Sequence, residues 1–418
     1  MKKLLLPICL SSALYATTLT DLIHIALENN KSIQQSEIKL DDKKQNIKES
    51  TSSYLPTLSL SADATTHEIE SGSGKSNGES SSISLNANQL IYDFGKTINQ
   101  IKASKKSFEA TQKELISTTN NVVLNVKKTY YDILNKQRLV DIALESIKID
   151  EVQLYQAKEY FKAKIKTKID LTDAQFQLSN SKLELLKAQY NLKKANANLI
   201  TIVGETNTFD IEETLDINNI INLIESKNYN LEELLNNALK NRAEIKMYKD
   251  LIRAATLSYQ SGKDTNYPTL NLTASYKDTQ SKDIVSLEST QSNLGIYLKW
   301  ELFSGFRTEA KTQLLLNTLR NTKEQLKEQE LTIKENVSIA YYDVKQNIDS
   351  VKLSQFNLKL AQQKLHLAQE RYKNGLNDLV ELNDSKLDFI TAKNNLINQY
   401  YGYKVAQAVL DYEIGVIY

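Results

Sequence analysis

An internal duplication constrains this chain more than any other feature of its sequence. Similar strings recur about 211 positions apart, in the same order. The matched strings are Leu55-Pro56-Thr57-Leu58 with Tyr267-Pro268-Thr269-Leu270, Tyr130-Tyr131-Asp132 with Tyr341-Tyr342-Asp343, and Asp170-Leu171-Thr172-Asp173 with Glu381-Leu382-Asn383-Asp384. A register held over more than a hundred residues predicts one structural unit that is present twice.

Charge and targeting signals narrow the possible functions and the location of the chain. The 52 basic and 51 acidic side chains balance, which gives no reason to expect a nucleic-acid partner. Met1-Lys2-Lys3, the mostly apolar run up to Leu14, and Ala16 are typical of a secretory signal peptide, predicted here as residues 1–16. The single cysteine, Cys9, lies inside it, so the mature chain is expected to carry no disulfide.

Each repeat is predicted to contain a short amphipathic helix, a β-hairpin and two long helices. Pro56 and Pro268 are expected to mark the change from helix to strand, because proline ends a helix but is tolerated at the first residue of a strand. The predicted boundaries are a first repeat at 17–204 (hairpin about 55–93, long helices about 96–203), an inter-repeat equatorial segment at 205–230, and a second repeat at 231–418 (hairpin about 268–303, long helices about 306–415).

The predicted hairpins alternate between apolar and polar residues. Leu58, Leu60 and Ala62 share one face, while Ser59 and Ser61 share the other. In the second copy Leu270, Leu272, Ala274 and Tyr276 are expected to pair with the set Ile296, Leu298, Trp300 and Leu302. Such alternation is typical of transmembrane β-barrels, although a half-buried hairpin of a soluble protein shows it too.

The long helices carry a narrow apolar stripe. Neither glycine nor proline occurs from Lys96 to Val203, so a helix that starts near Lys96 can run for about 65 residues, close to 100 Å. Helices of that length with interrupted heptads indicate coiled-coil packing between neighbours. Four strands from one chain would leave open edges, which lipid does not tolerate, so a barrel requires several copies of the chain.

Several motifs together resemble the TolC-like outer-membrane efflux family. They are the proline strings, Ile91-Tyr92-Asp93-Phe94-Gly95 with Leu302-Phe303-Ser304-Gly305, and Arg371-Tyr372-Lys373-Asn374-Gly375-Leu376 followed by Val380-Glu381-Leu382-Asn383-Asp384. The resemblance implies a mixed α and β fold: a homotrimer with a 12-stranded transmembrane β-barrel that continues into a periplasmic α-helical barrel. It also implies location in the cell outer membrane, contact with its lipid, and two partners, a periplasmic adaptor protein and an inner-membrane transporter.

The resemblance also implies a pore constriction where the long helices turn back. Its residues would be Glu381 and Asp384, which the family places toward the tunnel axis, and Tyr372, which looks like a tyrosine that holds the closed state. Asp170 and Asp173 are the first-copy equivalents. Asn377 stands where the family often has an arginine, so the closed-state contacts are expected to differ here.

The two turns themselves are candidate adaptor-docking tips. They are centred on Lys164 and Ile165 in the first copy and on Gly375 and Leu376 in the second, where glycine permits a tight turn. The first turn has no glycine, and we expect it to be looser. Lysines surround the first turn and acids follow the second, a pattern that could guide docking or simply belong to solvated surface.

No enzyme reading stands out. His24, His67 and His366 have no metal-ligand spacing, and neither a P-loop nor a dinucleotide-binding fingerprint is present, so no cofactor is expected. The sequence therefore predicts a channel that acts as the passive exit duct of a tripartite export system and is gated at its periplasmic end. The alternative is a secreted or periplasmic coiled-coil scaffold without channel activity. Small-molecule efflux, metal-ion efflux and protein secretion stay open as the exported cargo.

Overall fold

A computed structural model of the chain describes residues 17–71, 74–206, 209–211, 213, 215, 220, 224, 229–282, 286–376 and 378–416. The expected signal peptide, Asn377 and much of the inter-repeat segment lie outside the described residues. Within the described ranges, no helix has both the length and the hydrophobicity needed to cross a membrane.

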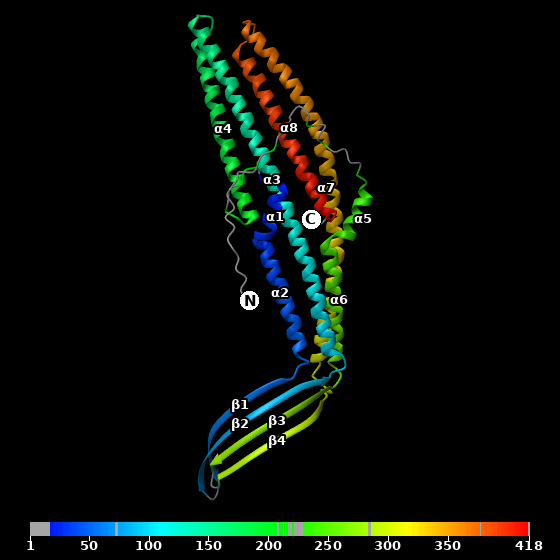
Figure 1. Ribbon diagram of the computed structural model, residues 1–418. Coiled ribbons are helices and arrows are strands. Elements are labelled where there is room, and N and C mark those ends of the chain that lie inside the picture. Colours follow the sequence, from blue (N-terminus) through cyan, green and yellow to red (C-terminus); the bar gives the residue numbers. More distant parts are fainter. Residues whose placement is uncertain are drawn as a thin grey trace. The chain divides into compact units, whose positions relative to one another are not determined.

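The order of elements repeats once along the chain (Figure 1). The first copy consists of α1 (Leu19–Asn29), α2 (Lys31–Ser52), β1 (Thr57–Ser71), β2 (Gly74–Tyr92), α3 (Lys96–Lys162) and α4 (Lys168–Val203). The second consists of α5 (Leu231–Asn241), α6 (Ala243–Asp264), β3 (Thr269–Lys282), β4 (Ser286–Lys299), α7 (Arg307–Lys373) and α8 (Leu379–Glu413). Pro56 and Pro268 each directly precede a strand. Both α3 and α7 are 67 residues long, so the duplication in sequence is also a duplication in structure.

The prediction of one short helix before each hairpin was wrong, because each copy has two. In the first copy Asn30 has an extended backbone (φ −64°, ψ 127°) that ends α1. Its side-chain oxygen accepts the Ser32 N–H (2.9 Å) at the start of α2, and its amide donates to the Ile202 carbonyl (2.6 Å) near the end of α4. A single residue therefore forms the corner between α1 and α2, without any glycine or proline to mark it.

In the second copy Arg242 takes the place of Asn30. Its guanidinium donates to the Glu413 carboxylate (2.6 Å) and to the Tyr412 carbonyl (3.3 Å) at the end of α8, and it lies over the Tyr412 ring. In both copies, the residue between the two short helices binds the end of the last long helix. Asn30 does so through its side-chain amide, and Arg242 does so through an ion pair.

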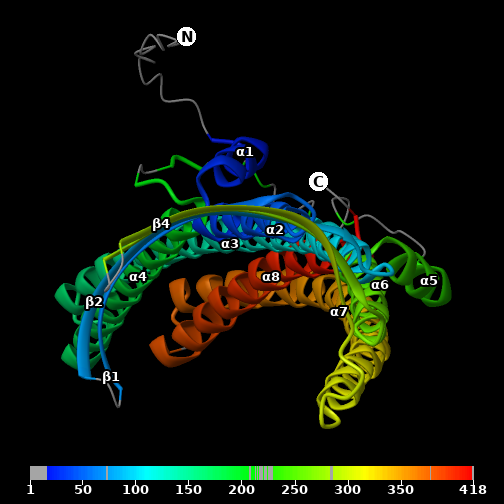
Figure 2. The same ribbon diagram turned by 90° about the horizontal axis from the view of Figure 1, so that it is seen from below.

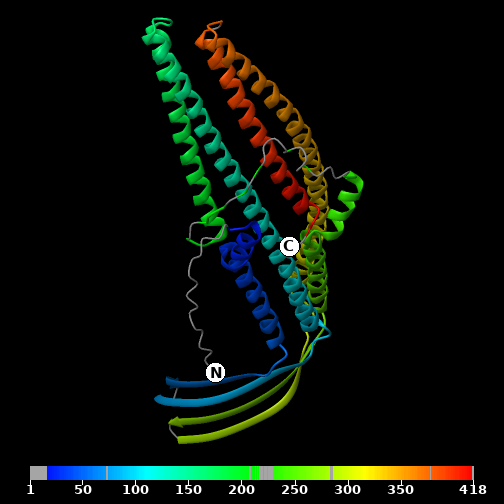
Figure 3. The same ribbon diagram turned by 45° about the horizontal axis from the view of Figure 1, so that its top comes forward.

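The chain divides into two compact units. The helical unit contains the residues up to Gln35, Ile116–Arg242 and the residues from Leu331 onward; the sheet-containing unit contains Ser36–Leu115 and Ala243–Glu330. In the helical unit, α3 with α4 and α7 with α8 form two antiparallel pairs (Figure 3). Its core consists of buried apolar side chains, among them Val126, Ile133, Val337, Leu396 and Ile397.

The four strands form one antiparallel sheet in the order β1-β2-β3-β4, which is curved along the strands (Figure 2). The two predicted hairpins are joined by pairing of β2 with β3. Leu270 lies opposite Leu298, and Leu272 lies opposite Ile296. Trp300 and Leu302 were expected to pair as well, but β4 ends at Lys299 and both residues follow it.

The sheet has one apolar face and one polar face. On the apolar face Leu60 lies opposite Leu85, and Leu85 lies opposite Tyr276. Many of these side chains are exposed in the single chain, including Leu58, Leu60, Ile83, Leu294, Ile296 and Leu298. On the other face Ser61 and Ser84 share a hydrogen bond (2.8 Å), and Ser82 donates to Asp63 (2.6 Å).

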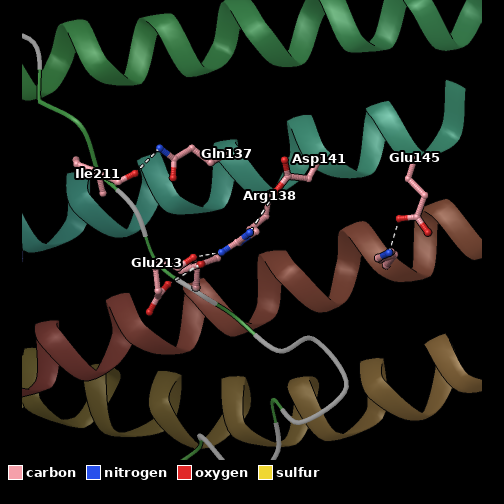
Figure 4. Close-up of polar contacts among 8 residues, drawn as sticks. Gln137, Arg138, Asp141, Glu145, Ile211 and Glu213 are labelled. Carbon is pink, nitrogen blue, oxygen red and sulfur yellow. Dashed lines mark hydrogen bonds and ion pairs between the residues drawn. The ribbon is translucent and has the colours of Figure 1, made fainter. Parts of the chain in front are cut away.

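Part of the inter-repeat segment is fastened to the helical unit (Figure 4). Gln137 of α3 donates to the Ile211 carbonyl (2.7 Å), and Arg138 donates to the Glu213 carbonyl. The Glu213 carboxylate accepts the Tyr401 hydroxyl of α8 (2.8 Å). This clasp, formed by Gln137, Arg138, Ile211, Glu213 and Tyr401, links α3 of the first copy to α8 of the second.

Candidate constriction site at the helix turns

Two five-residue turns connect the long helices of the helical unit, at 163–167 and 374–378. Both close by the same backbone hydrogen bonds. The Ile165 N–H donates to the Tyr160 carbonyl (2.9 Å), and the Leu376 N–H donates to the Arg371 carbonyl (2.8 Å). These pairs correspond under the 211-residue offset.

The expectation of a looser first turn was wrong. Lys164 takes the left-handed conformation (φ 60°) that Gly375 takes in the second turn (φ 73°). A left-handed lysine is uncommon, because its Cβ crowds the backbone there, and this is why a sequence without glycine suggested a different turn. Ile165 and Leu376 are 66% and 70% exposed, so both tips present an apolar side chain to solvent.

Glu381 and Asp384 lie in the first two turns of α8, on one helical face. Asp378 caps this helix and accepts the Glu381 N–H (3.0 Å). The Glu381 carboxylate lies 3.3 Å from the Arg371 guanidinium at the end of α7, and the Asp384 side chain is exposed. Arg371 was not identified as a partner from the sequence, since it precedes the turn by three residues and only the folded turn brings it to Glu381.

Tyr372 is buried between the two helix pairs. It is 1% exposed, its ring centroid lies 6.0 Å from that of Tyr160, and the Lys166 ammonium lies 5.4 Å from its ring centroid. Its hydroxyl has no hydrogen-bond partner among the described residues. Burial raises the pKa of the Tyr372 phenol, and the negative charge of Asp170 raises it further. The phenol therefore stays protonated as a hydrogen-bond donor.

Asp170 and Asp173 differ in their surroundings. Asp170 forms a capping box at the start of α4, where its carboxylate accepts from the Thr167 N–H (2.9 Å) and hydroxyl (2.7 Å). Burial alone would raise the pKa of Asp170, but the hydrogen bonds from Thr167 and the charge of Lys166 outweigh it and lower the pKa. Asp173 is exposed. Asp170 thus already has a structural role at the turn, beside the buried Tyr372.

The described residues of one chain hold no group of three or more His, Cys, Asp or Glu side chains placed to bind a metal ion. A divalent ion at the carboxylates of Glu381 and Asp384 would therefore need acids from more than one copy of the chain.

Comparison with known proteins agrees with this architecture. Outer membrane protein TolC of Salmonella enteritidis is 22% identical over 440 residues, which cover 100% of this chain and 87% of that protein. A solved structure of CusC matches with a TM-score of 0.84 at 17% identity, covering 96% of this chain and 93% of that one. The Campylobacter jejuni CmeC outer membrane channel matches with a TM-score of 0.82 at 16% identity, covering 95% and 85%.

The solved structures show the fold, and the match to a family model shows which family the chain belongs to. The model described as outer membrane efflux protein matches residues 22–205 and 234–416, one segment in each copy of the repeat. The chain belongs to the outer membrane efflux protein family.

Proposed function

We propose that this chain assembles as a homotrimer into a channel tunnel that serves as the passive exit duct of an export system and is gated at the helix turns. As a member of its family, the protein resides in the outer membrane. The proteins that it matches include outer membrane protein TolC and the CmeC outer membrane channel. The assembly, the gate and the partners are the parts that we infer.

The observation that carries the proposal is the exposed apolar face of the sheet. Leu294 and Ile296 are 77% and 69% exposed in the single chain, a state that lipid would relieve and water would not. The sheet ends at β1 and β4, whose outer edges have no strand partner in the described chain. Because open edges are not tolerated in lipid, the strands have to close with other copies, and three copies supply twelve.

The helical unit shows the same need for copies. On α4 the side chains of Ile169, Phe176, Leu183 and Tyr190 are exposed at intervals of seven residues. On α7 exposed apolar residues follow a similar heptad: Ile339, Tyr342, Leu353, Phe356, Leu360 and Leu367. Heptad stripes are typical of coiled-coil partners. We infer that α4 of one copy packs against α7 of the next, which would close a helical ring beyond the barrel.

Around such a ring, one Glu381 and one Asp384 from each copy would form two rings of carboxylates. Rings of carboxylates favour cations and raise one another's pKa. Tyr372, whose hydroxyl is buried and has no hydrogen-bond partner among the described residues, would help to hold the closed state from within its own chain. Asp170 and Asp173 would lie near the same constriction.

The export machine would contact the exposed tips. Lys164 and Ile165 in one turn, with Gly375 and Leu376 in the other, offer mixed basic and apolar surface to a periplasmic adaptor. An inner-membrane transporter would supply the energy, and opening would be a repacking of helices. The inter-repeat segment at 205–230 would wrap the helical ring at its equator, held there by the clasp.

Single-channel recording in a planar lipid bilayer tests the proposal, with the wild type compared with the double variant Glu381→Ala/Asp384→Ala. We expect small cation-selective openings in the wild type, and larger or less selective openings in the variant. Failure of folded protein to insert into the bilayer would favour a coiled-coil scaffold instead. A scaffold, however, leaves the exposed apolar face of the sheet without a purpose.

A further inference from the structure

A buried ion pair joins three helices of the helical unit just beyond the constriction. The Lys386 ammonium of α8 donates to both carboxylate oxygens of Asp150 on α3 (2.6 Å each) and to the Ser181 hydroxyl on α4 (3.1 Å). The Asp150 side chain is 0% exposed and that of Lys386 is 10% exposed. Ser181 also shares a hydrogen bond with Ser146 of α3 (3.1 Å).

Burying two opposite charges is costly, because each loses its hydration. Here the loss is offset only by a complete set of contacts: both oxygens of Asp150 are used, and the ammonium has three acceptor contacts. A hydrophobic pair of similar volume could pack such a seam as well or better. Packing of α8 on α3 and α4 therefore does not by itself explain these charges.

The repeat provides an internal comparison. Under the 211-residue offset, Asp150 corresponds to Ala361, Lys386 to Gln175 and Ser181 to Ala392. None of the three polar groups is kept at the equivalent position of the other copy. In the assembly proposed above, the equivalent contact is the one between α4 of one copy and α7 of the next. That contact has to form without these three polar groups. The ion pair therefore occurs in only one of the two equivalent contacts, the one that holds α8 against α3 and α4 of its own chain.

Its position connects it to the constriction. Lys386 follows Asp384 by two residues on α8, so α8 cannot shift without moving both groups. A cleft of about 690 Å³ lies beside the pair, and its lining includes Ser181, Asp384 and Lys386. Water in this cleft could hydrate the ions once they separate. A pair that is buried when joined and hydrated when apart has two defined states, as a switch requires.

We propose that Asp150, Ser181 and Lys386 form a lock that holds α8 against α3 and α4 in the closed tunnel, and that opening separates Lys386 from Asp150. The proposal rests on the proposed function, since it concerns the gate of the same channel. It assigns the closed state of this chain to a contact inside each copy, in addition to any contact between copies.

The lock is tested by single-channel recording of three variants in full-length protein. Asp150→Asn removes the carboxylate charge and is expected to raise the open probability on the order of tenfold or more. Ser181→Ala leaves the ion pair intact and is expected to give a smaller rise. Lys386→Arg keeps the charge and a matched hydrogen-bonding fork, and is expected to stay close to the wild type.

The control is Asp388→Asn, which breaks an exposed pair between α8 and α7, Lys364 with Asp388 (2.6 Å, 54% and 55% exposed). It is expected to leave the open probability unchanged, because exposed pairs contribute little. The trimeric assembly of each variant is first verified from its mobility on a gel loaded without heating the sample. If Asp150→Asn fails to assemble, the open probability of Ser181→Ala is compared with that of Lys386→Arg. The lock predicts the higher open probability for Ser181→Ala.

Three results would overturn the lock. Asp150→Asn and Ser181→Ala could conduct like the wild type, Asp388→Asn could open the channel as much as Asp150→Asn, or Lys386→Arg could open it as much as Ser181→Ala. In each case Glu381→Ala/Asp384→Ala would still alter conduction, and the proposed function would stand. If inserted wild type and every variant lacked conductance, both proposals would fail together.

Discussion

Lys164 and Gly375 hold the same left-handed backbone conformation at corresponding positions of two helix turns, with φ of 60° and 73°. The turn is therefore set by the geometry that the repeat requires and not by the residue that occupies it. Lysine at this position carries a strain of about 1–2 kcal/mol that glycine avoids. That strain lies at the exposed tip of the helical unit, where we propose that the adaptor docks.

Glycines with positive φ should differ in how well they tolerate a side chain. Gly375→Ala is expected to destabilise the protein by about 1 kcal/mol, through backbone strain alone, because an added Cβ at Gly375 meets nothing within 4 Å. Gly204→Ala should cost about 1–3 kcal/mol more, since its Cβ would lie 2.5 Å from the Asn29 carbonyl oxygen. Denaturant midpoints of the purified variants measure the difference. Equal losses of stability in the two variants would show that the backbone at Asn29 and Asn30 can shift to accommodate the added Cβ.

Much of the fold could be predicted because the sequence repeats its own signals. Alternation in the hairpins gave the two faces of the sheet, and the absence of glycine and proline gave the long helices. The break between α1 and α2 escaped prediction, although Asn30 caps α2 locally by accepting the Ser32 N–H. One asparagine within a helical pattern does not by itself end a helix, and its contact with the Ile202 carbonyl, 172 residues away in the chain, leaves no local pattern.

The two faces of β4 should respond differently to charge. Leu294 is on the apolar face and its neighbour Asn293, opposite Ser275, is on the polar face. If the apolar face contacts lipid, Leu294→Arg should cost about 2–4 kcal/mol and reduce the amount of folded protein in the outer membrane. Asn293→Arg is the matched control and should insert normally. Outer-membrane fractions analysed on unheated gels measure both. Normal insertion of the Leu294 variant would contradict a lipid-facing position.

Removal of Arg371 should change selectivity more than stability. Its pair with Glu381 is exposed on both sides (54% and 43%), so Arg371→Gln is expected to alter stability by less than about 1 kcal/mol. It removes the cation that is paired with the Glu381 carboxylate, and a unit charge at ~4 Å in water is worth about 1 kcal/mol, about fivefold in a permeability ratio. Cation preference should therefore rise by up to about fivefold.

The measurement is the reversal potential of single channels in a salt gradient. Arg307→Gln is a suitable control, because Arg307 forms a comparable exposed pair with Glu301 (2.8 Å) in the sheet-containing unit. A fall in cation preference for Arg371→Gln would mean that Glu381 does not face the permeating ions.

The candidate site could be only partly predicted from the sequence. Glu381, Asp384 and Tyr372 were predicted from the family resemblance of the motifs beside the turn, and their role in a constriction stays a prediction. Arg371 was overlooked as a partner because the turn itself creates the pairing. Asp150 and Lys386 are 236 residues apart, and their burial depends on how α8 packs against α3, which no sequence pattern specifies. Charges on long helices are usually solvated, so nothing distinguished these two from the others.

The clasp should make stability depend on alkaline pH. Burial raises the pKa of Tyr401 above the ordinary value of 10.0, and the Glu213 carboxylate that accepts its hydrogen bond raises it further. Burial raises the pKa of Tyr400 as well. Above about pH 10 the unfolded chain loses these protons while the folded protein keeps them, so stability falls as the pH rises. Each tyrosine contributes up to about 1.4 kcal/mol per pH unit in that range.

Tyr401→Phe should remove one of these two contributions. At neutral pH it should cost about 1–3 kcal/mol, because the Glu213 carboxylate loses its donor. Between about pH 10 and 12 its denaturant midpoint should fall less steeply than that of the wild type, so the two curves converge. Tyr297→Phe, in the sheet-containing unit, serves as the matched control that removes a tyrosine hydroxyl without touching the clasp. Parallel curves for Tyr401→Phe and the wild type would show that Tyr401 ionises in the folded protein as readily as in the unfolded chain, and that the clasp does not hold it.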